Sequence, residues 1–154
     1  MKYMETKNQT YHVLARGIIL SDDFILIAHC KGMDNTFLPG GHVEFKESIR
    51  KTLTREIMEE LGQECSIQQY IGCVEADFEL PESYHQEINH LFIVALNKIN
   101  HEVNPTSNEN HLEFYWIHKN DMDKYNLQPS PVRDLIMRYI NKEQGPFWES
   151  TIMD

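Results

Sequence analysis

The apolar residues of the chain gather in runs that predict β-strands. The segments HVLARGIIL (12–20) and FILIAHC (24–30) are rich in Ile, Leu and Val, and the turn-forming residues SDD between them predict a β-hairpin. Two longer runs, IQQYIGCVEADFEL (67–80) and INHLFIVALNKI (88–99), predict long strands that are separated by a polar loop at 81–87.

The remaining strand signals are shorter. LEFYWIH (112–118) predicts a strand, and the polar residues at 104–110 before it predict a loop. The stretch 32–45 contains Gly32, Gly40 and Gly41, which predicts a loop with a short strand at 36–38.

Two segments have the spacing of helices. In residues 47–61, an apolar residue recurs at every fourth position and forms one stripe, which consists of Ile49, Leu53, Ile57 and Leu61. Gly62 is suited to end this helix. A second helix is predicted at 131–141, with Ser130 as its cap and Pro131 at its first position. Its apolar face consists of Val132, Leu135, Ile136 and Tyr139.

Each of these helices has one apolar face and needs a sheet to cover it. The order of elements therefore predicts an α+β fold, an α/β/α sandwich in which a mixed β-sheet lies between the two helices. The 154 residues, of which 41% are hydrophobic, suit a single domain over 1–154. The tail from about 143 is not assigned, and its Phe147 and Trp148 predict that it docks on another surface.

Charge and cysteine content exclude some classes of function. The formal net charge of −10 disfavours binding to long nucleic acid, which needs clustered Lys and Arg. The three cysteines form no C-x-x-C pair, so we expect free thiols in a reducing, cytoplasmic setting. We expect no membrane association, because no run reaches the roughly 18 apolar residues of a spanning helix, and the N-terminus has no apolar core of a signal peptide.

Three glutamates lie unusually close together in the first predicted helix. Glu56, Glu59 and Glu60 fall within an arc of roughly 100° on the helix, and Glu60 lies inside the apolar stripe. A solvated acidic face is the alternative interpretation. However, Glu56 and Glu60 form a like-charge pair near the negative end of the helix dipole, which is unfavourable in the absence of a cation. Clustered carboxylates suit Mg²⁺, or alternatively Mn²⁺.

These glutamates belong to a longer pattern, which is Gly41-x5-Glu47-x7-Arg55-Glu56-Ile57-Met58-Glu59-Glu60-Leu61-Gly62. The pattern resembles the signature of the Nudix (MutT-like) hydrolases, and every charged and glycine position of that signature is filled. One departure is Gln63, where the family usually has an aliphatic residue. That position packs rather than reacts, so we expect a small structural effect.

The resemblance implies an activity and a set of site residues. Nudix enzymes hydrolyse the pyrophosphate linkage of a nucleoside diphosphate joined to another moiety, with divalent cations as cofactors. Glu56, Glu59 and Glu60 match the metal-binding positions, and one glutamate of this helix acts in some members as the base. The Gly40 carbonyl matches a further ligand, and Arg55 and Glu47 match an ion pair that orients the glutamates.

Residues outside the signature complete the expected site. Family members often have an additional acidic residue on a later loop, and Glu109 is the best placed here, ahead of Glu113 and Glu87. Arg16 is a candidate phosphate ligand, because a guanidinium can donate two parallel hydrogen bonds to a phosphate, and a paired surface arginine is the alternative. The glycines Gly40 and Gly41 allow the backbone to approach the substrate closely.

The substrate is expected to be a small nucleotide: a nucleotide sugar, a dinucleoside polyphosphate or a nucleoside triphosphate. A homodimer is left open. Two alternatives to an enzyme are a catalytically silent Nudix-fold nucleotide sensor and a scaffold with an acidic helix. The histidines and cysteines lack the two-plus-two spacing of a structural zinc site, so we do not assign one.

Overall fold

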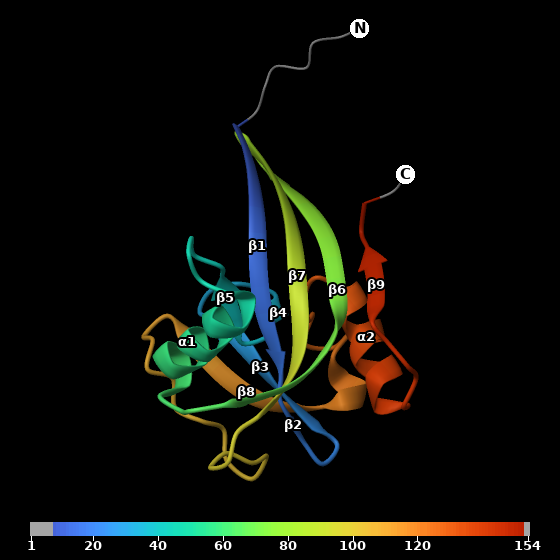
Figure 1. Ribbon diagram of the computed structural model, residues 1–154. Helices are drawn as coiled ribbons and strands as arrows, with labels where there is room; N and C mark the ends of the chain where they lie inside the picture. Colours follow the sequence, from blue (N-terminus) through green and yellow to red (C-terminus); the bar gives the residue numbers. More distant parts are fainter. Residues whose placement is uncertain (1–7, 153–154) are drawn as a thin grey trace, which may run out of the picture.

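The structure is a computed structural model that describes residues 8–152, and its strands form two sheets (Figure 1). The five-stranded sheet has the order β5-β1-β7-β6-β9. Its strands are β1 (Asn8–Ile18), β5 (Gly40–His42), β6 (Ser66–Leu80), β7 (Ser83–Ala95) and β9 (Phe147–Ser150). The sheet is mixed, because β1 pairs with β7 and β6 pairs with β9 in parallel, whereas the other pairs are antiparallel.

The second sheet is centred on β3 (Phe24–Cys30). The strand β8 (Leu112–His118) pairs with the whole length of β3, while the short strands β2 (Leu20–Ser21) and β4 (Thr36–Phe37) also pair with it. All of these pairs are antiparallel. A short 3-10 helix, η1 (Lys119–Asp121), follows β8.

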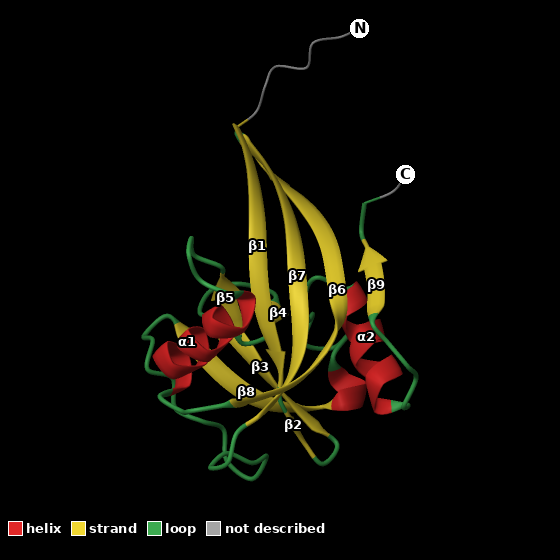
Figure 2. Cartoon of the chain, viewed as in Figure 1, coloured by secondary structure: helices red, strands yellow, loops and turns green. Residues whose placement is uncertain are grey.

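Two helices lie on opposite sides of the sheets (Figure 2). In α1 (Ile49–Leu61), Leu53, Ile57 and Leu61 pack with Phe92 and Trp116 in one buried cluster. The buried residues of α2 (Pro131–Ile140) pack in a separate cluster, and they are Val132, Leu135 and Ile136. The predicted fold class, a mixed sheet between the two helices, is therefore confirmed.

The predicted hairpin between the first two runs is largely wrong. Only Leu20 and Ser21 pair with β3, whereas the longer β1 pairs with β7 and β5 in the other sheet. The chain changes sheet at Ile19, whose side chain is buried directly after that of Ile18. Leu20 and Ser21 after it pair in the second sheet, so the run divides into two strands.

The polar stretch 81–87 is mostly strand rather than loop, which corrects the second prediction. Leu80 pairs with Ser83 across a two-residue turn, and the polar residues from Ser83 onward also pair with β1. This end of the hairpin extends beyond the core (Figure 1), so its residues need not be apolar to form strands. Two smaller differences are that 40–42 forms β5 and that β7 ends at Ala95.

The ends of the helices test the predicted caps. Ser48 caps α1 by accepting a hydrogen bond from the Lys51 N–H at 3.1 Å. Gly62 ends α1 with φ +66°, and its N–H donates to the Met58 carbonyl, as predicted. At α2, Pro131 is the first residue, but the Ser130 side chain makes no capping bond, because Ser130 has helical φ and ψ instead of the extended conformation of a cap.

The tail docks on the first sheet. Its strand β9 adds to the edge of β6, with Phe147 opposite Gly72. Phe147 is buried in the cluster under α2, whereas Trp148 is 60% exposed. The prediction that the tail packs on another surface therefore holds for Phe147 and not for Trp148.

Candidate active site

The glycine-rich strand β5 lies against the glutamate face of α1. Gly40 pairs with Arg16 and Gly41 pairs with Ala15 of β1. Gly40 has φ +134°, and a Cβ there would collide with the Ala15 carbonyl. A Cβ at Gly41 would lie 2.5 Å from Glu56 Oε1. Gly40 is therefore required for β5 to approach β1 this closely, whereas a side chain at Gly41 would displace the Glu56 carboxylate.

Arg55 is the centre of the charged network on α1. Its Nε donates to Glu47 Oε2 at 2.8 Å and one terminal nitrogen donates to Glu47 Oε1 at 2.9 Å. The other terminal nitrogen reaches Glu56 at 3.1 Å and Glu59 at 3.3 Å. Arg55 also donates to the His42 carbonyl at 3.2 Å. One guanidinium thus fixes two helix glutamates and ties them to the loop before the helix, in line with the expected Arg55–Glu47 pair.

Glu47 is held as a carboxylate by two donors. The hydrogen bonds from Arg55, followed by that from Thr52 Oγ1 at 2.6 Å, lower the pKa of Glu47 to about 2. The same bonds to Glu47 raise the pKa of Arg55 further above its ordinary value. The buried Thr52 was not among the residues that the sequence indicated, because a threonine inside a helix carries no signal of this contact.

Glu60 is a buried acid. It is 4% exposed, and burial raises its pKa to about 8, against the opposing effect of Arg16. Among the described residues, its carboxylate accepts a long hydrogen bond from the Gly40 N–H at 3.4 Å. Burial also raises the pKa of Glu56, whose side chain is 18% exposed, whereas that of Glu59 is 49% exposed. The acidic residues thus range from exposed to buried along one face.

These residues fit a divalent cation chemically. Carboxylate and carbonyl oxygens are the ligands of Mg²⁺ and Mn²⁺, and a cation would compensate the buried charge of Glu60. Within residues 8–152, no three His, Cys, Asp or Glu side chains converge closely enough to hold a metal as they stand. Arg55 engages Glu56 and Glu59 in this arrangement, so binding would require these side chains to turn toward the cation.

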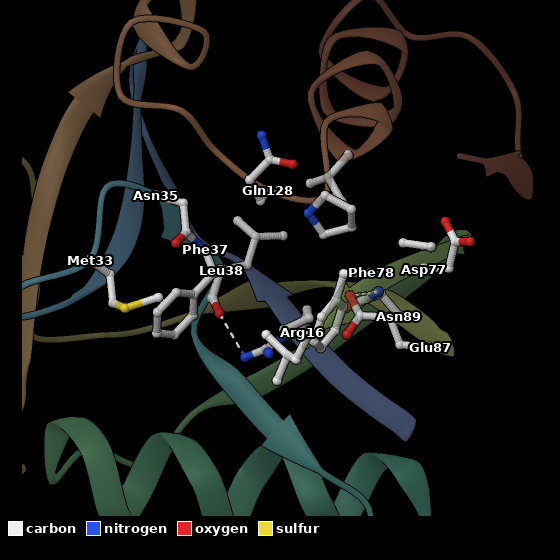
Figure 3. Close-up of a pocket in the computed structure, with 14 residues that line it drawn as sticks. Arg16, Met33, Asn35, Phe37, Leu38, Asp77, Phe78, Glu87, Asn89 and Gln128 are labelled. Atoms are coloured by element: carbon white, nitrogen blue, oxygen red, sulfur yellow. Dashed lines mark hydrogen bonds between the residues drawn. The ribbon is translucent and has the colours of Figure 1, made fainter. Parts of the chain in front are cut away.

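Arg16 lies between the glutamates and a cavity of about 450 Å³, which it lines (Figure 3). Its guanidinium donates to the Leu38 carbonyl at 3.1 Å and lies over the ring of Phe37, 5.3 Å from its centre. Burial lowers the pKa of Arg16, while Glu60, Glu87 and Glu56 act in the opposite direction. Arg16 is half-buried, and its guanidinium is held by a backbone carbonyl and an aromatic ring, which is not the setting of the paired surface arginine in the alternative interpretation.

The cavity has an apolar wall with a few polar groups. Figure 3 shows Met33, Asn35 and Phe37 on one side, with Phe78 and Glu87 on the other. The loop that precedes α2 supplies Gln128 and Pro129, and Leu38 comes from the segment between β4 and β5. Apart from Arg16 on β1, the other lining residues, such as Asp77 and Asn89, come from β6, β7 and α2. The sequence did not indicate this cavity, because its walls come from segments that are far apart in the chain.

The three candidate acids on later segments have different surroundings. Glu109 lies close enough to raise the pKa of Glu60, and its neighbour Asn108 donates to the Glu60 carbonyl at 2.8 Å. Glu113 accepts hydrogen bonds from His29 and Tyr115, on the face of β8 opposite to α1. Glu87 lines the cavity. The structure therefore brings Glu109 to the glutamates, whereas Glu113 lies apart from them.

A row of histidines crosses the first sheet near this site. His12 contacts His42 at 2.8 Å through Nδ1 and His85 at 2.8 Å through Nε2. Because His12 uses opposite ring nitrogens, its two partners cannot share one metal ion with it. The row has no sequence signal, since its members come from β1, β5 and β7.

The comparisons with known proteins identify the family. The NUDIX domain family model matches residues 10–138, so the chain belongs to the NUDIX domain family. The expected Nudix membership is thereby confirmed, together with the class of Nudix pyrophosphohydrolase. Hydrolases of this family generally use divalent metal ions and act on small nucleotide substrates. No curated protein sequence matches the chain.

Solved structures share the fold. The MutT protein from Methanosarcina mazei Go1 is 20% identical, with a TM-score of 0.65 over 89% of this chain and 98% of that one. An ADP-ribose pyrophosphatase from Streptococcus suis is 15% identical, with a TM-score of 0.65 over 92% and 99% of the two chains. A UDP-X diphosphatase is 19% identical, with a TM-score of 0.64 over 91% and 67%.

Proposed function

We propose that this protein is a divalent-metal-dependent hydrolase that cleaves the pyrophosphate linkage of a nucleoside diphosphate joined to another moiety. The observation that carries the proposal is the placement of Glu56, Glu59 and Glu60 on one face of α1, against the Gly40 backbone and beside the half-buried Arg16 and its cavity. Substrates of this kind include nucleotide sugars, dinucleoside polyphosphates and nucleoside triphosphates.

The residues divide into three roles. Glu56, Glu59, Glu60 and the Gly40 carbonyl would hold Mg²⁺, or alternatively Mn²⁺, which when bound neutralises phosphate oxygens and lowers the pKa of water. Arg55 and Glu47 keep the helix glutamates in position. Glu109 would contribute a further carboxylate from the neighbouring loop, as its electrostatic effect on Glu60 suggests.

The substrate would lie across β5. Arg16 would donate hydrogen bonds to a phosphate at the boundary between the glutamates and the cavity. The exposed Phe78 and the ring of Phe37 give the cavity the apolar surface that the nonreacting part of a nucleotide requires. One helix carboxylate would take the proton of the attacking water, a role that general-base catalysis assigns to a correctly placed acid.

The cysteines and the helices bear on the compartment of the protein. Cys30, Cys65 and Cys73 are free, which supports a reducing, cytoplasmic compartment. No described helix is long and apolar enough to cross a membrane.

The test is a mass-spectrometric screen of the purified protein with Mg²⁺ against nucleotide sugars, dinucleoside polyphosphates and nucleoside triphosphates, with EDTA as the control. A nucleotide sugar should give a nucleoside monophosphate and a sugar phosphate. In ¹⁸O-water the label should enter a phosphate and not the sugar C1. Release of free sugar with intact nucleoside diphosphate would contradict the mechanism.

Matched variants separate the metal site from surface charge. Glu59→Gln should lower kcat at least about a hundredfold, equivalent to about 2.7 kcal/mol of barrier, because it removes a metal ligand. Glu64→Gln, which changes an exposed glutamate beyond the end of α1, should leave kcat unchanged. Nucleotide binding without turnover across the whole panel would instead favour the sensor alternative.

A further inference from the structure

The loop that joins β3 to β4 forms part of the cavity wall. It contributes Met33 and Asn35, which lie across the cavity from Phe78 (Figure 3). Phe37, in the strand that follows, carries the wall onward to Arg16. The shape of the cavity on this side therefore depends on what holds the loop in place.

His29 holds this loop through two hydrogen bonds. It lies near the end of β3, where it is paired with Thr36 on one side and Glu113 on the other. Its Nε2 is 2.7 Å from the Met33 carbonyl and its Nδ1 is 3.1 Å from Glu113 Oε2. A carbonyl and a carboxylate can only accept hydrogen bonds, so both ring nitrogens must donate. The arrangement therefore requires the charged imidazolium form of His29.

The surrounding groups favour that charged form. The hydrogen bond to Met33, followed by that to Glu113, raises the pKa of His29. The Tyr115 hydroxyl donates a hydrogen bond to Glu113 and lowers the pKa of Glu113, and His29 and Lys31 lower it further. Glu113 in turn raises the pKa of Tyr115 to about 12, so Tyr115 remains a donor.

Tyr125, from the segment before α2, acts on Tyr115, and its carbonyl accepts a hydrogen bond from Thr36 at 2.8 Å. The titratable and charged groups around His29 are thus Glu113 and Tyr115 on β8, Lys31 on the loop, and Tyr125. The ordinary pKa of His29 lies closer to neutrality than that of any of these four groups.

We propose that His29 is a positioning residue that fixes Met33 and Asn35 in the cavity wall while its imidazole is charged, so that nucleotide affinity falls when His29 loses its proton. Neutral His29 can donate only one hydrogen bond, and either the Met33 carbonyl or Glu113 then loses its partner. The inference rests on the proposed function only in that the cavity receives the nonreacting part of a nucleotide.

The test compares nucleotide binding at pH 6 and pH 9. Calorimetry with AMP, CMP, GMP and UMP gives the Kd of each for the wild type, His29→Ala, His29→Arg and the control His118→Asn. His118 lies at the other end of the sheet, opposite Phe24, and asparagine can still cap η1 as His118 does. Thermal melting at both pH values shows whether each variant is folded.

We expect the Kd of His29→Ala to exceed that of the wild type by about tenfold at pH 6, the effect of losing a hydrogen bond to a charged group, and by less than about twofold at pH 9. His29→Arg keeps its charge, so its Kd should change less between pH 6 and pH 9 than the Kd of His118→Asn, which retains His29 and should follow the wild type. Where a substrate turns over, KM should follow Kd while kcat stays within about threefold.

Several results would overturn the inference. These are parallel pH profiles for the wild type and a folded His29→Ala, an ordinary or lowered His29 pKa in an NMR titration, or the failure of all four nucleotides to bind the wild type at pH 6. Binding that follows His29 without any turnover would reject the proposed hydrolase and keep the inference. Turnover with no effect of His29→Ala on nucleotide affinity would keep the proposed hydrolase and reject the inference.

Discussion

Glu60→Gln should stabilise the metal-free protein at alkaline pH, although it removes a residue of the candidate active site. Burial raises the pKa of Glu60 from its ordinary value of 4.5 to about 8. The folded protein therefore keeps the proton of Glu60 to a higher pH than the unfolded chain does. The wild type loses stability as the pH rises from 4.5 to about 8. At 1.36 kcal/mol for each pKa unit, the full cost above pH 8 is at most about 5 kcal/mol.

The glutamine variant resembles the protonated acid at every pH, so it avoids this cost. Its neutral side chain can still accept the hydrogen bond from the Gly40 N–H. Urea unfolding in EDTA at pH 5, 7 and 9 gives the free energy of unfolding of both proteins. The advantage of Glu60→Gln over the wild type should grow by about 4 kcal/mol between pH 5 and pH 9.

Glu59→Gln is the matched control. Its side chain is 49% exposed and forms an i,i+4 ion pair with Arg55 at 3.3 Å, which is worth less than about 1 kcal/mol. This variant should therefore show no growing advantage with pH. If the free energies of unfolding of the wild type and Glu60→Gln change in parallel with pH, the conclusion that Glu60 is a buried acid without a compensating charge is wrong. If a cation relieves the cost, Mg²⁺ should raise the stability of the wild type at pH 8 more than that of Glu60→Gln.

Three further outcomes are expected. Gln63→Leu should keep kcat within a few-fold, because Gln63 follows the end of α1, and a loss of about a hundredfold, or 2.7 kcal/mol, would show that its amide contacts the substrate or metal. Arg55→Lys should lower kcat by at least about tenfold while the fold persists, because an ammonium cannot hold Glu47 and Glu56 together as the guanidinium does, and unchanged turnover would contradict the orienting role. Phe147→Ala should reduce the free energy of unfolding by about 3–5 kcal/mol, whereas Trp148→Ala, at a 60% exposed position, should change it by about 0.5 kcal/mol. Equal effects of the two variants in urea unfolding would contradict the docking of the tail through Phe147.

The sequence by itself determined the elements whose signals are local. Helix α1 and its end at Gly62 follow from apolar spacing over four residues and from the conformational freedom of glycine. The strand at 112–118 was predicted at its observed bounds, because its run of aromatic and aliphatic residues is a local strand signal. The placement of Glu56, Glu59 and Glu60 on one face follows from helical geometry, which also predicted that Glu60 lies in the apolar stripe, where it is buried.

Only the tertiary structure decided which strands pair and which distant side chains meet. The first apolar run was expected to fold back on the second, but β1 pairs instead with β7, about 75 residues later in the chain. Ser83–Ala95 begins as a strand through polar residues because its backbone hydrogen bonds are satisfied by β1 and β6, and side-chain polarity does not report those partners.

The same distinction applies to the site. The Arg55–Glu47 contact spans eight residues and was expected from the family pattern. The half-buried position of Arg16, the cavity beside it and the hydrogen bond between His29 and Glu113 depend on segments that are joined only by packing. The pKa values of these groups are set by desolvation and by partners that are remote in the chain, so local sequence could name the charged residues but could not determine which of them would be buried, paired or left to bind a ligand.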